Sequence, residues 1–442
     1  MLFIQIVFII ICCLITKSIP NSVVRKIMLF FELLYSLQIV LAIIDPLQVH
    51  PIGLSTILMF NLQLLFFPLG ARAFMNNNVK RVAIAQNNEL RYIEVNSVLF
   101  YIQIVVFLIT LYNYNRMQAY MGTLDGLTNL SREYYYSGFY SGAELMLNSF
   151  LDGYRLISVY LLYQLLFFRK RKLSTKEIIF IVLGVATLVL SSMTSMGRAV
   201  ILKLAILLIL VYFLSQERAK EKTKTIKRSA LIILVISAAV IVGTTLIRFN
   251  YVADEAGDII KESYYELLIE PFIEYFYVPI QAFDFGKDTI LNFNVPFMGG
   301  AELAGIIDFL MTPLVVLDHA IGDYTINNII GARMTPQFFF ETGQGWNALF
   351  TGASNYYIDL GWFGFIVFPF LHGFLLALFT IKSRYSTVAL LLLVFLFDCS
   401  FSHLTSSGIQ SMRTAFYFIW VFLIIRLSRS YTKESITLNR AT

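Results

Sequence analysis

The chain has 442 residues, of which 58% are hydrophobic and only 14% are charged, and its mean hydropathy is +0.71. Soluble domains carry about 25% charged residues, so this composition excludes a soluble globular protein and indicates an integral membrane protein. The net charge is +6. We expect the lipid bilayer to be one partner of this chain, and we expect no nucleic-acid partner.

Apolar runs recur along the whole chain at about the length, ~20 residues, that crosses a bilayer as a helix. They predict an all-α polytopic integral membrane protein with about eleven transmembrane helices, rather than a barrel, forming a single membrane domain over residues 1–442. The first run lacks a basic leader and a cleavage site, so we interpret it as a retained helix. The predicted spans are 2–15, 27–44, 52–69, 95–112, 151–168, 178–195, 199–214, 230–247, 355–380, 388–401 and 414–427.

The basic residues of the short loops predict the orientation of these spans, because Lys and Arg are retained on the cytoplasmic side. Every second loop is basic, as in Arg169-Lys170-Arg171-Lys172. With eleven spans, all the basic loops fall on one side, which puts the N-terminus outside and the C-terminus in the cytoplasm. The turns at 45–51, 195–198 and 402–413 then lie on the outer side.

One long interruption separates the eighth and ninth predicted spans. Residues 248–350 contain 14 Asp and Glu against 4 Lys and Arg, a net charge of −10. Loops of this length in compact proteins are usually functional. We expect this segment to be a large, partly helical external loop that folds back over the helices and closes a cavity.

The loop is predicted to begin with an amphipathic helix. Acidic residues recur every fourth position from Asp258 to Glu274, and apolar residues recur at the same interval two positions further on, from Ile260 to Phe276. Two positions correspond to about 200° of rotation, so the acidic and apolar residues lie on opposite faces. Pro271 is expected to break this helix and Pro279 to end it.

Four arginines on the predicted outer side are candidates for binding a phosphate group, because cations are scarce there and guanidinium pairs well with phosphate oxygens. Arg198 precedes the span at 199, where the helix dipole would add to its charge. Arg248 ends a span, Arg333 lies in the long loop, and Arg413 begins the last span. For each, the alternative is an interfacial residue paired with a nearby acid.

Catalytic candidates are the histidines and carboxylates of the outer side. His319 and His403 could serve as bases or phosphate partners, or could be structural. Asp359 stands at the start of a predicted span, where a carboxylate has either a functional role or a capping partner. Glu341 is a further candidate.

Cysteines and metal-binding patterns point to no further chemistry. The chain has three cysteines, Cys12, Cys13 and Cys399, all in apolar runs. Adjacent cysteines are poor disulfide partners, and nothing has metal-ligand spacing. We expect no metal and no cofactor.

Two stretches carry a resemblance to a known family: Ser195-Met196-Gly197-Arg198 at a helix start, and Asn347–Thr351 followed by Tyr357–Gly364. With the span number and the large outer loop before the last three spans, the chain resembles the Wzy-type oligosaccharide repeat-unit polymerases of bacteria, which make O-antigen or capsule. These belong to a polymerase and ligase superfamily of C-type membrane glycosyltransferases. Arg198 corresponds by motif to an arginine of the related ligases, and His319 is the candidate for their catalytic-loop histidine.

The resemblance implies a multi-pass enzyme of the bacterial inner membrane that acts at its outer face. Such enzymes transfer a growing glycan from undecaprenyl diphosphate to the non-reducing end of a lipid-linked repeat unit, and a chain-length regulator protein is a further expected partner. In a compatible mechanism, arginines offset the charge of the leaving diphosphate, and a carboxylate or histidine accepts the hydroxyl proton. The loop would exclude water.

Three other functions remain open from the sequence. An O-antigen ligase uses the same donor with a different acceptor. A lipid-linked oligosaccharide flippase is a transporter and needs a polar path through the membrane, whereas charges within the predicted spans are few. A membrane acyltransferase is disfavoured because no convincing intramembrane histidine pattern is present.

Overall fold

The structure is a computed structural model that describes most of the chain in segments. The described residues are 1–77, 93–121, 142–168, 172–195, 199–215, 270–293, 296–334, 338–340, 345–346 and 351–426. Two compact units contain them. Unit 1 comprises Met1–Leu90 and Phe272–Ala415, and unit 2 comprises Arg91–Pro271 and Phe416–Thr442.

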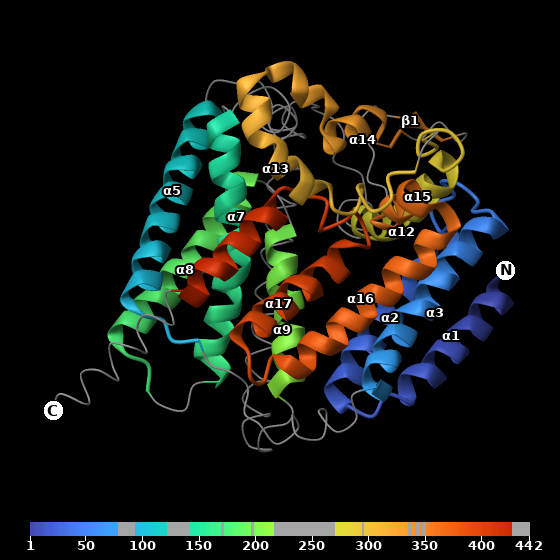
Figure 1. Cartoon of the computed structure of the whole chain (residues 1–442), viewed down its shortest axis with the longest axis horizontal. Helices are drawn as coiled ribbons and strands as arrows, with labels where there is room; N and C mark the ends of the chain where they lie inside the picture. The colour runs from blue at the N-terminus through green and yellow to red at the C-terminus, as the bar shows by residue number, and fades with distance from the viewer. Residues whose placement is uncertain are drawn as a thin grey trace, which may run out of the picture. The chain divides into compact units, whose positions relative to one another are not determined.

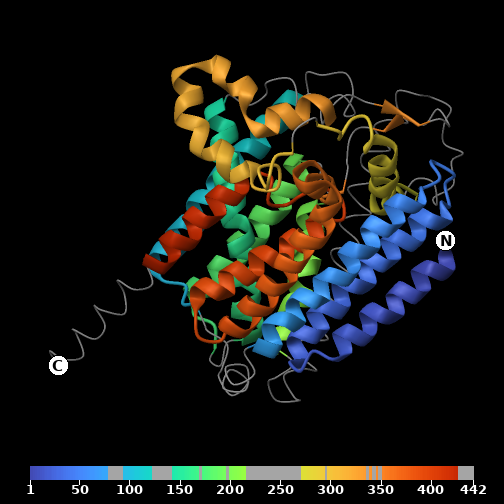
Figure 2. The same ribbon diagram turned by 45° about the vertical axis from the view of Figure 1, so that its right-hand side comes forward.

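Unit 1 is built on four helices that run side by side, α1, α2, α3 and α16 (Figures 1 and 2). Its elements in chain order are α1 (Leu2–Lys17), α2 (Ser22–Ile44), α3 (Leu54–Asn77), α12 (Glu270–Gly286), α13 (Ala304–Leu317), η2 (His319–Tyr324), α14 (Ile326–Met334), β1 (Phe338–Phe339), β2 (Gly345–Trp346), α15 (Ala353–Leu360), η3 (Gly361–Phe363), α16 (Gly364–Lys382) and α17 (Thr387–Ser402). The strands β1 and β2 pair antiparallel.

Glycines allow α3 and α16 to approach each other closely. A Cβ atom added at Gly70 would lie 1.9 Å from the carbonyl oxygen of Phe370, and one at Gly373 would lie 1.9 Å from that of Phe67. No larger residue fits at either position. Helices in membranes commonly use small residues for such contacts, because lipid supplies no hydrophobic force to hold them together.

Unit 2 contains α5 (Ser97–Met121), α7 (Gly142–Tyr163), the π-helical turn η1 (Gln164–Phe168), α8 (Thr175–Ser195) and α9 (Ala199–Ser215). Buried polar side chains link its helices: the Ser158 hydroxyl donates to Gln103 Oε1 at 2.7 Å, and Gln103 Nε2 donates to Thr187 Oγ1 at 3.2 Å. A last helix covers residues 413–426. Its Trp420 donates from Nε1 to the carbonyl of Phe150 at 2.8 Å.

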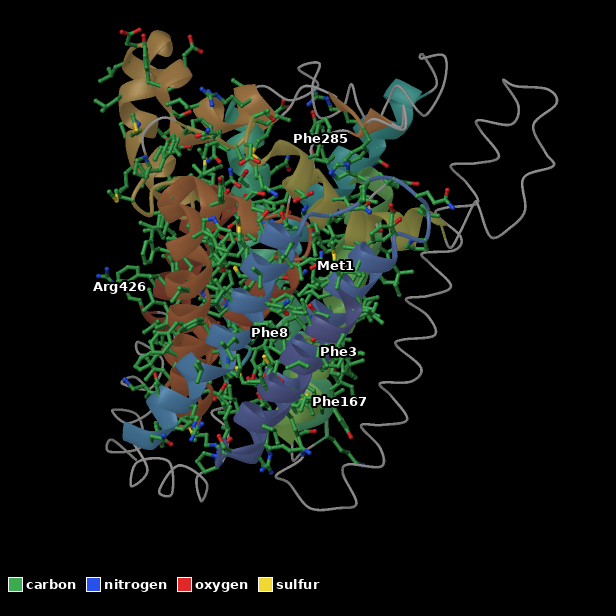
Figure 3. The ribbon with its side chains drawn as sticks, turned by 90° about the vertical axis from the view of Figure 1, so that its right-hand side faces the viewer. Met1, Phe3, Phe8, Phe167, Phe285 and Arg426 are labelled. Atoms are coloured by element: carbon green, nitrogen blue, oxygen red, sulfur yellow. The ribbon has the colours of Figure 1, made fainter. Side chains whose placement is uncertain are left out.

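Five helices in the described part of the chain are long and apolar enough to cross a membrane. They are Ser22–Ile44, Leu54–Asn76, Ser97–Arg116, Thr175–Ser192 and Ala353–Lys382. Large apolar side chains also lie exposed along α1, α2 and α8, among them Phe3 at 76%, Leu33 at 56% and Val182 at 60% exposure (Figure 3 labels Phe3). Rows of exposed apolar side chains on helices are what lipid-facing surfaces require, since water would disfavour them.

The predicted spans within the described residues lie on helical structure, which supports the predicted all-α membrane protein, although the span 355–380 is divided among α15, η3 and α16. The span predicted at 230–247 lies outside the described residues. The count of eleven spans, the single domain and the orientation stay predictions. Within unit 1, the described part of the long segment 248–350 contacts the connection 45–53. Tyr277 Oη accepts from the Leu47 N–H at 3.2 Å, and Gln281 Nε2 donates to the His50 carbonyl at 2.7 Å.

The prediction that Pro279 ends the amphipathic helix is wrong. Helix α12 begins at Glu270, has Pro271 in its first turn, and continues through Pro279 to Gly286. Proline is tolerated at a helix start, but inside a helix it removes one hydrogen bond. Packing of the fully buried side chains Tyr277 and Phe283, one before and one after Pro279, compensates for the lost hydrogen bond. The first part of the predicted helix, residues 258–269, lies outside the described residues.

The predicted span 355–380 is interrupted rather than continuous. Helix α15 ends at Leu360, a 3₁₀ turn follows at Gly361–Phe363, and α16 begins at Gly364. Gly361 has φ of +56° and ψ of −134°, a combination that suits glycine because a Cβ would be strained there. The interruption separates α15 as a short helix with its own buried face.

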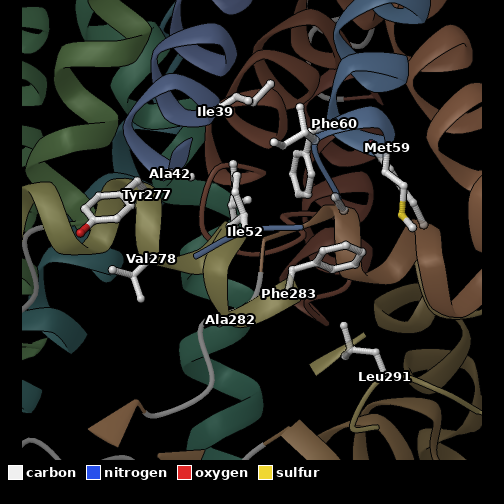
Figure 4. Packing of buried hydrophobic residues seen from close by; sticks show 14 of the residues in the cluster. Ile39, Ala42, Ile52, Met59, Phe60, Tyr277, Val278, Ala282, Phe283 and Leu291 are labelled. Atoms are coloured by element: carbon white, nitrogen blue, oxygen red, sulfur yellow. The ribbon is translucent and has the colours of Figure 1, made fainter. Parts of the chain in front are cut away.

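An apolar core holds α12, α15 and the 45–53 connection together. The ring of Phe283 on α12 lies 5.5 Å from that of Phe60 on α3, in an edge-to-face arrangement, and Ile52 packs into the same cluster (Figure 4). The core thus fixes the described part of the long segment against the ends of α2 and α3.

Candidate functional site

Three segments far apart in the sequence meet in unit 1 and bury a group of polar side chains. They are the turn before α13, the helix α15 and the connection after α17. The Gly352 N–H donates to the His403 carbonyl at 2.9 Å, and Asn355 Nδ2 donates to the Ala301 carbonyl at 3.1 Å. We call the group the buried acid cluster. It consists of the buried residues Glu302, Asn355, Asp359, His403 and Ser407 and of Gln410, which is partly buried.

Asp359 uses both carboxylate oxygens to hold the turn before α13. Its Oδ1 accepts from the Ala301 N–H at 2.8 Å and its Oδ2 accepts from the Glu302 N–H at 2.9 Å. The side chain is fully buried. Such paired contacts cap the unsatisfied backbone donors that precede a helix. Asp359 therefore orients the turn that carries Glu302.

Glu302 is a buried carboxyl without a cationic partner among the described residues. Its Oε2 accepts from the Ser407 hydroxyl at 3.0 Å, and the residue is 6% exposed. The pKa of Glu302 is raised to about 8, mainly by burial and also by the nearby charge of Asp359, against the opposing effect of hydrogen bonds from Ser407 and Asn355. A carboxyl with such a pKa exchanges a proton near neutral pH, as a general base does.

Glu302 is not among the site residues predicted from the sequence. The only available signal was its place as the single charged residue in the apolar, glycine-flanked run 295–307. A lone charge in such a run must find buried partners or remain neutral. Its partner Ser407 follows more than 100 positions later.

His403 lies against Tyr356 with its ring stacked at a centroid distance of 4.7 Å. The imidazole is buried, and its Nε2 has no hydrogen-bond partner among the residues that the structure describes. A Cβ atom at Gly352 would come within 2.2 Å of His403 Nδ1, so only glycine leaves room for the ring. Burial, together with the nearby His372, lowers the pKa of His403 to about 3. The imidazole is therefore neutral at physiological pH and can contribute one hydrogen-bond donor and one acceptor.

The structure places two of the predicted arginines away from direct contact with this cluster. Arg333 is exposed at the end of α14, where Nη1 donates to the Asn292 carbonyl at 2.8 Å and the guanidinium lies 4.3 Å from the Phe293 ring centroid. Arg413 begins the helix at 413–426, and its side chain has no hydrogen-bond or ion-pair partner within the described ranges.

The side chains of four other predicted site residues lie outside what the structure describes. Arg198, Arg248 and Glu341 lie outside the described residues. The backbone of His319 begins η2, but its side chain lies outside what the structure describes. Of the predicted residues, the structure thus brings Asp359 and His403 into one cluster and adds Glu302 to them.

Within the described residues, no group of three or more His, Cys, Asp or Glu side chains is placed to hold a metal ion. The three cysteines are free thiols. The chemistry that the cluster itself offers is proton transfer at a buried carboxyl, supported by neighbouring hydroxyl, amide and imidazole groups.

Fold and composition together define a predominantly helical protein with helices suited to cross a membrane. Neither the protein-family models, nor the curated proteins, nor the solved structures contain a match to this chain.

Proposed function

We propose that this protein is a membrane glycosyltransferase that joins lipid-diphosphate-linked oligosaccharide repeat units into a surface polysaccharide, such as O-antigen. Its proposed place is the outer face of a bacterial inner membrane. The resemblance to Wzy-type polymerases suggests this reaction, and the buried acid cluster is the observation that carries it.

The reaction needs a base. A hydroxyl of the acceptor glycan attacks the anomeric carbon of the donor, the bond from that carbon to the diphosphate oxygen breaks, and the hydroxyl proton must leave. Glu302 is the proposed proton acceptor, because its pKa of about 8 makes its ionised form a stronger base than an ordinary carboxylate. Nε2 of His403, which has no hydrogen-bond partner in the described part of the chain, is the atom that we propose binds a hydroxyl of the reacting sugar.

The leaving diphosphate needs cations. Arg198 and Arg248 are the proposed partners on the strength of the sequence, and the side chain of Arg413, which has no partner among the described residues, is a third. Guanidinium groups neutralise a developing phosphate charge and bind its oxygens in pairs. Arg333 is a weaker member of this set, since it already pairs with a carbonyl and an aromatic ring.

Gene deletion followed by gel analysis of surface glycan tests the proposal. Loss of long polymer with one repeat unit retained on the anchor is the expected result. Loss of every repeat unit would instead indicate a ligase or a flippase, and an unchanged polymer would refute the proposed function.

Complementation of the deletion strain then tests the site. Glu302→Gln keeps the size and hydrogen-bonding capacity of the side chain but cannot accept a proton, so it should not restore polymer. The matched control is Glu32→Gln, which alters another buried carboxyl of unit 1, on α2, where its partner is Thr16. Glu32→Gln should restore polymer. Restoration by Glu302→Gln at equal protein level would exclude Glu302 as the base.

A further inference from the structure

A second polar group in unit 1 lies apart from the buried acid cluster, at the start of α3 and the end of α12. We call it the Asp284 network: Gly53, Thr56, Asp284, Lys287 and His50. Asp284 Oδ2 lies 3.3 Å from His50 Nε2 and accepts from the Gly53 N–H at 3.0 Å. Its Oδ1 accepts from the Lys287 ammonium and from the Thr56 hydroxyl.

The charges inside this network are balanced. Asp284 receives four hydrogen-bond donors, which together hold the pKa of its carboxyl well below its usual range, although burial alone raises it. Lys287 in turn uses its three N–H bonds for Asp284, for Ser55 at 3.1 Å and for Thr56 at 2.9 Å. The paired ammonium and carboxylate leave no net charge, and Lys287 has no donor left for a ligand.

Among the three ionisable side chains of the network, that of His50 is the most exposed to solvent. Its side chain is 15% exposed, against 8% for Asp284 and 11% for Lys287. The ring is held between Phe340, stacked at 5.6 Å, and Phe285, edge-on at 5.6 Å. Two aromatic rings and one carboxylate thus fix the orientation of the His50 side chain. Binding of a ligand to His50 therefore costs little side-chain conformational entropy.

His50 keeps one hydrogen-bonding atom that the network does not use. In the tautomer that donates from Nε2 to Asp284, Nδ1 carries a lone pair, and within the described ranges Nδ1 makes no hydrogen bond. Gln281 is fully buried and donates from Nε2 to the His50 carbonyl at 2.7 Å, which holds the backbone of His50 in place. A deprotonated phosphate oxygen only accepts hydrogen bonds, so it does not match the Nδ1 lone pair, whereas a hydroxyl group does.

We propose that His50, held in place by Asp284, binds a hydroxyl group of the acceptor glycan and positions that glycan for the reaction. The choice of a sugar over other hydroxyl compounds rests on the proposed function. The hydrogen bond runs from the sugar hydroxyl to His50 Nδ1, and no charge is needed on either partner. His50 is then a determinant of acceptor binding, separate from the proton acceptor Glu302.

Two substitutions of His50 test this. His50→Phe keeps a ring between Phe285 and Phe340 but removes the acceptor nitrogen, whereas His50→Gln supplies an amide oxygen in its place. The matched control is Tyr324→Phe, which alters an aromatic side chain on the same long segment that is 72% exposed. Loss of one neutral hydrogen bond corresponds to about a tenfold weaker affinity.

The measurement is saturation-transfer NMR of full-length purified protein with a panel of methyl glycosides of hexoses, deoxyhexoses and N-acetylhexosamines. We expect the wild type and Tyr324→Phe to bind at least one glycoside, His50→Phe to bind about tenfold more weakly, and His50→Gln to recover part of the loss. Equal binding by wild type and His50→Phe, or no binding of any glycoside by the wild type, would overturn the inference.

A kinetic readout in membranes adds a second test. His50→Phe should raise KM for the acceptor about tenfold with kcat little changed, whereas Glu302→Gln should abolish kcat. A fall in kcat with unchanged KM in His50→Phe would overturn the positioning role. The NMR result stands apart from the proposed function, because a protein that binds sugar through His50 but makes no polymer would refute only the proposed function.

Discussion

Replacing Glu302 by glutamine should stabilise the protein increasingly as the pH rises. In the folded protein, burial raises the pKa of Glu302 from its ordinary value of 4.5 to about 8. The folded state therefore retains a proton that the unfolded chain releases above about pH 4.5. Because the folded state binds more protons in this window, the free energy of unfolding declines from about pH 4.5 to about pH 8 and then levels off. Glutamine mimics the protonated form at every pH.

The size of the effect follows from the same pKa. One pKa unit corresponds to about 1.4 kcal/mol, so the rise from 4.5 to about 8 gives roughly 5 kcal/mol between the two ends of the window. The entropy of unfolding is about 2.1 cal/mol/K per residue, which for 442 residues makes 1 kcal/mol about 1 °C in Tm. The Tm of Glu302→Gln, relative to the Tm of the wild type, should therefore rise by about 1.5 °C per pH unit between pH 4.5 and pH 8, up to roughly 5 °C.

Thermal unfolding followed by tryptophan fluorescence in detergent, at pH values from 5 to 9, measures this difference. Asp323→Asn is the control, since Asp323 is an exposed carboxylate side chain on the same long segment. Its Tm should follow the wild type at every pH. A Tm difference between Glu302→Gln and the wild type that stays constant across this pH range would refute the conclusion that burial raises the pKa of Glu302. As a base, the same residue should also make polymer formation in membranes increase with pH up to about 8, because only its ionised form accepts a proton.

Three further substitutions test other parts of the molecule. Arg198→Ala, at unchanged protein level, should abolish long-chain glycan and leave single repeat units on a gel, and a normal chain-length distribution would contradict its proposed role. Gly373→Ala should lower folded yield strongly by size-exclusion chromatography, because its Cβ would lie 1.9 Å from the Phe67 carbonyl oxygen, whereas Gly322→Ala, whose nearest contact is 3.3 Å, should not. Asp359→Ala, which removes two charge-assisted hydrogen bonds, should cost about 2–5 kcal/mol of unfolding free energy. Asp359→Asn should lose less in the same thermal assay.

The helices were predictable because membrane spans follow a local rule. A run of apolar residues long enough to cross lipid must satisfy its own backbone, and a helix is the way to do so. The helix ends were less predictable. Pro279 obeys a local rule that ends helices, yet α12 continues through it because packing of Tyr277 and Phe283 outweighs the lost hydrogen bond. Local rules therefore predicted which segments are helical better than where each helix stops.

The candidate site was predictable only where a residue is unusual for its position. Asp359 was conspicuous as a carboxylate at the start of an apolar run, and His403 as one of four histidines. Glu302 was not conspicuous among 14 acids of the long loop, because what distinguishes it is its burial against Ser407. Likewise, His50 and Asp284 are 234 positions apart, so no spacing in the sequence joins them.

Under the proposed function, the two polar groups of unit 1 would serve two bound glycans, one at each group. Hydrolysis needs a base and a water molecule, whereas polymerisation also needs a second glycan held in a fixed place. The rings of His403, Tyr356, Phe365 and Phe283 form a continuous chain of contacts, and Phe283 directly precedes Asp284. This packed aromatic chain connects His403 of the buried acid cluster to the residue next to Asp284, so it links the two polar groups through close-packed side chains. If the acceptor binds at His50, this packing sets where its hydroxyl can meet the base.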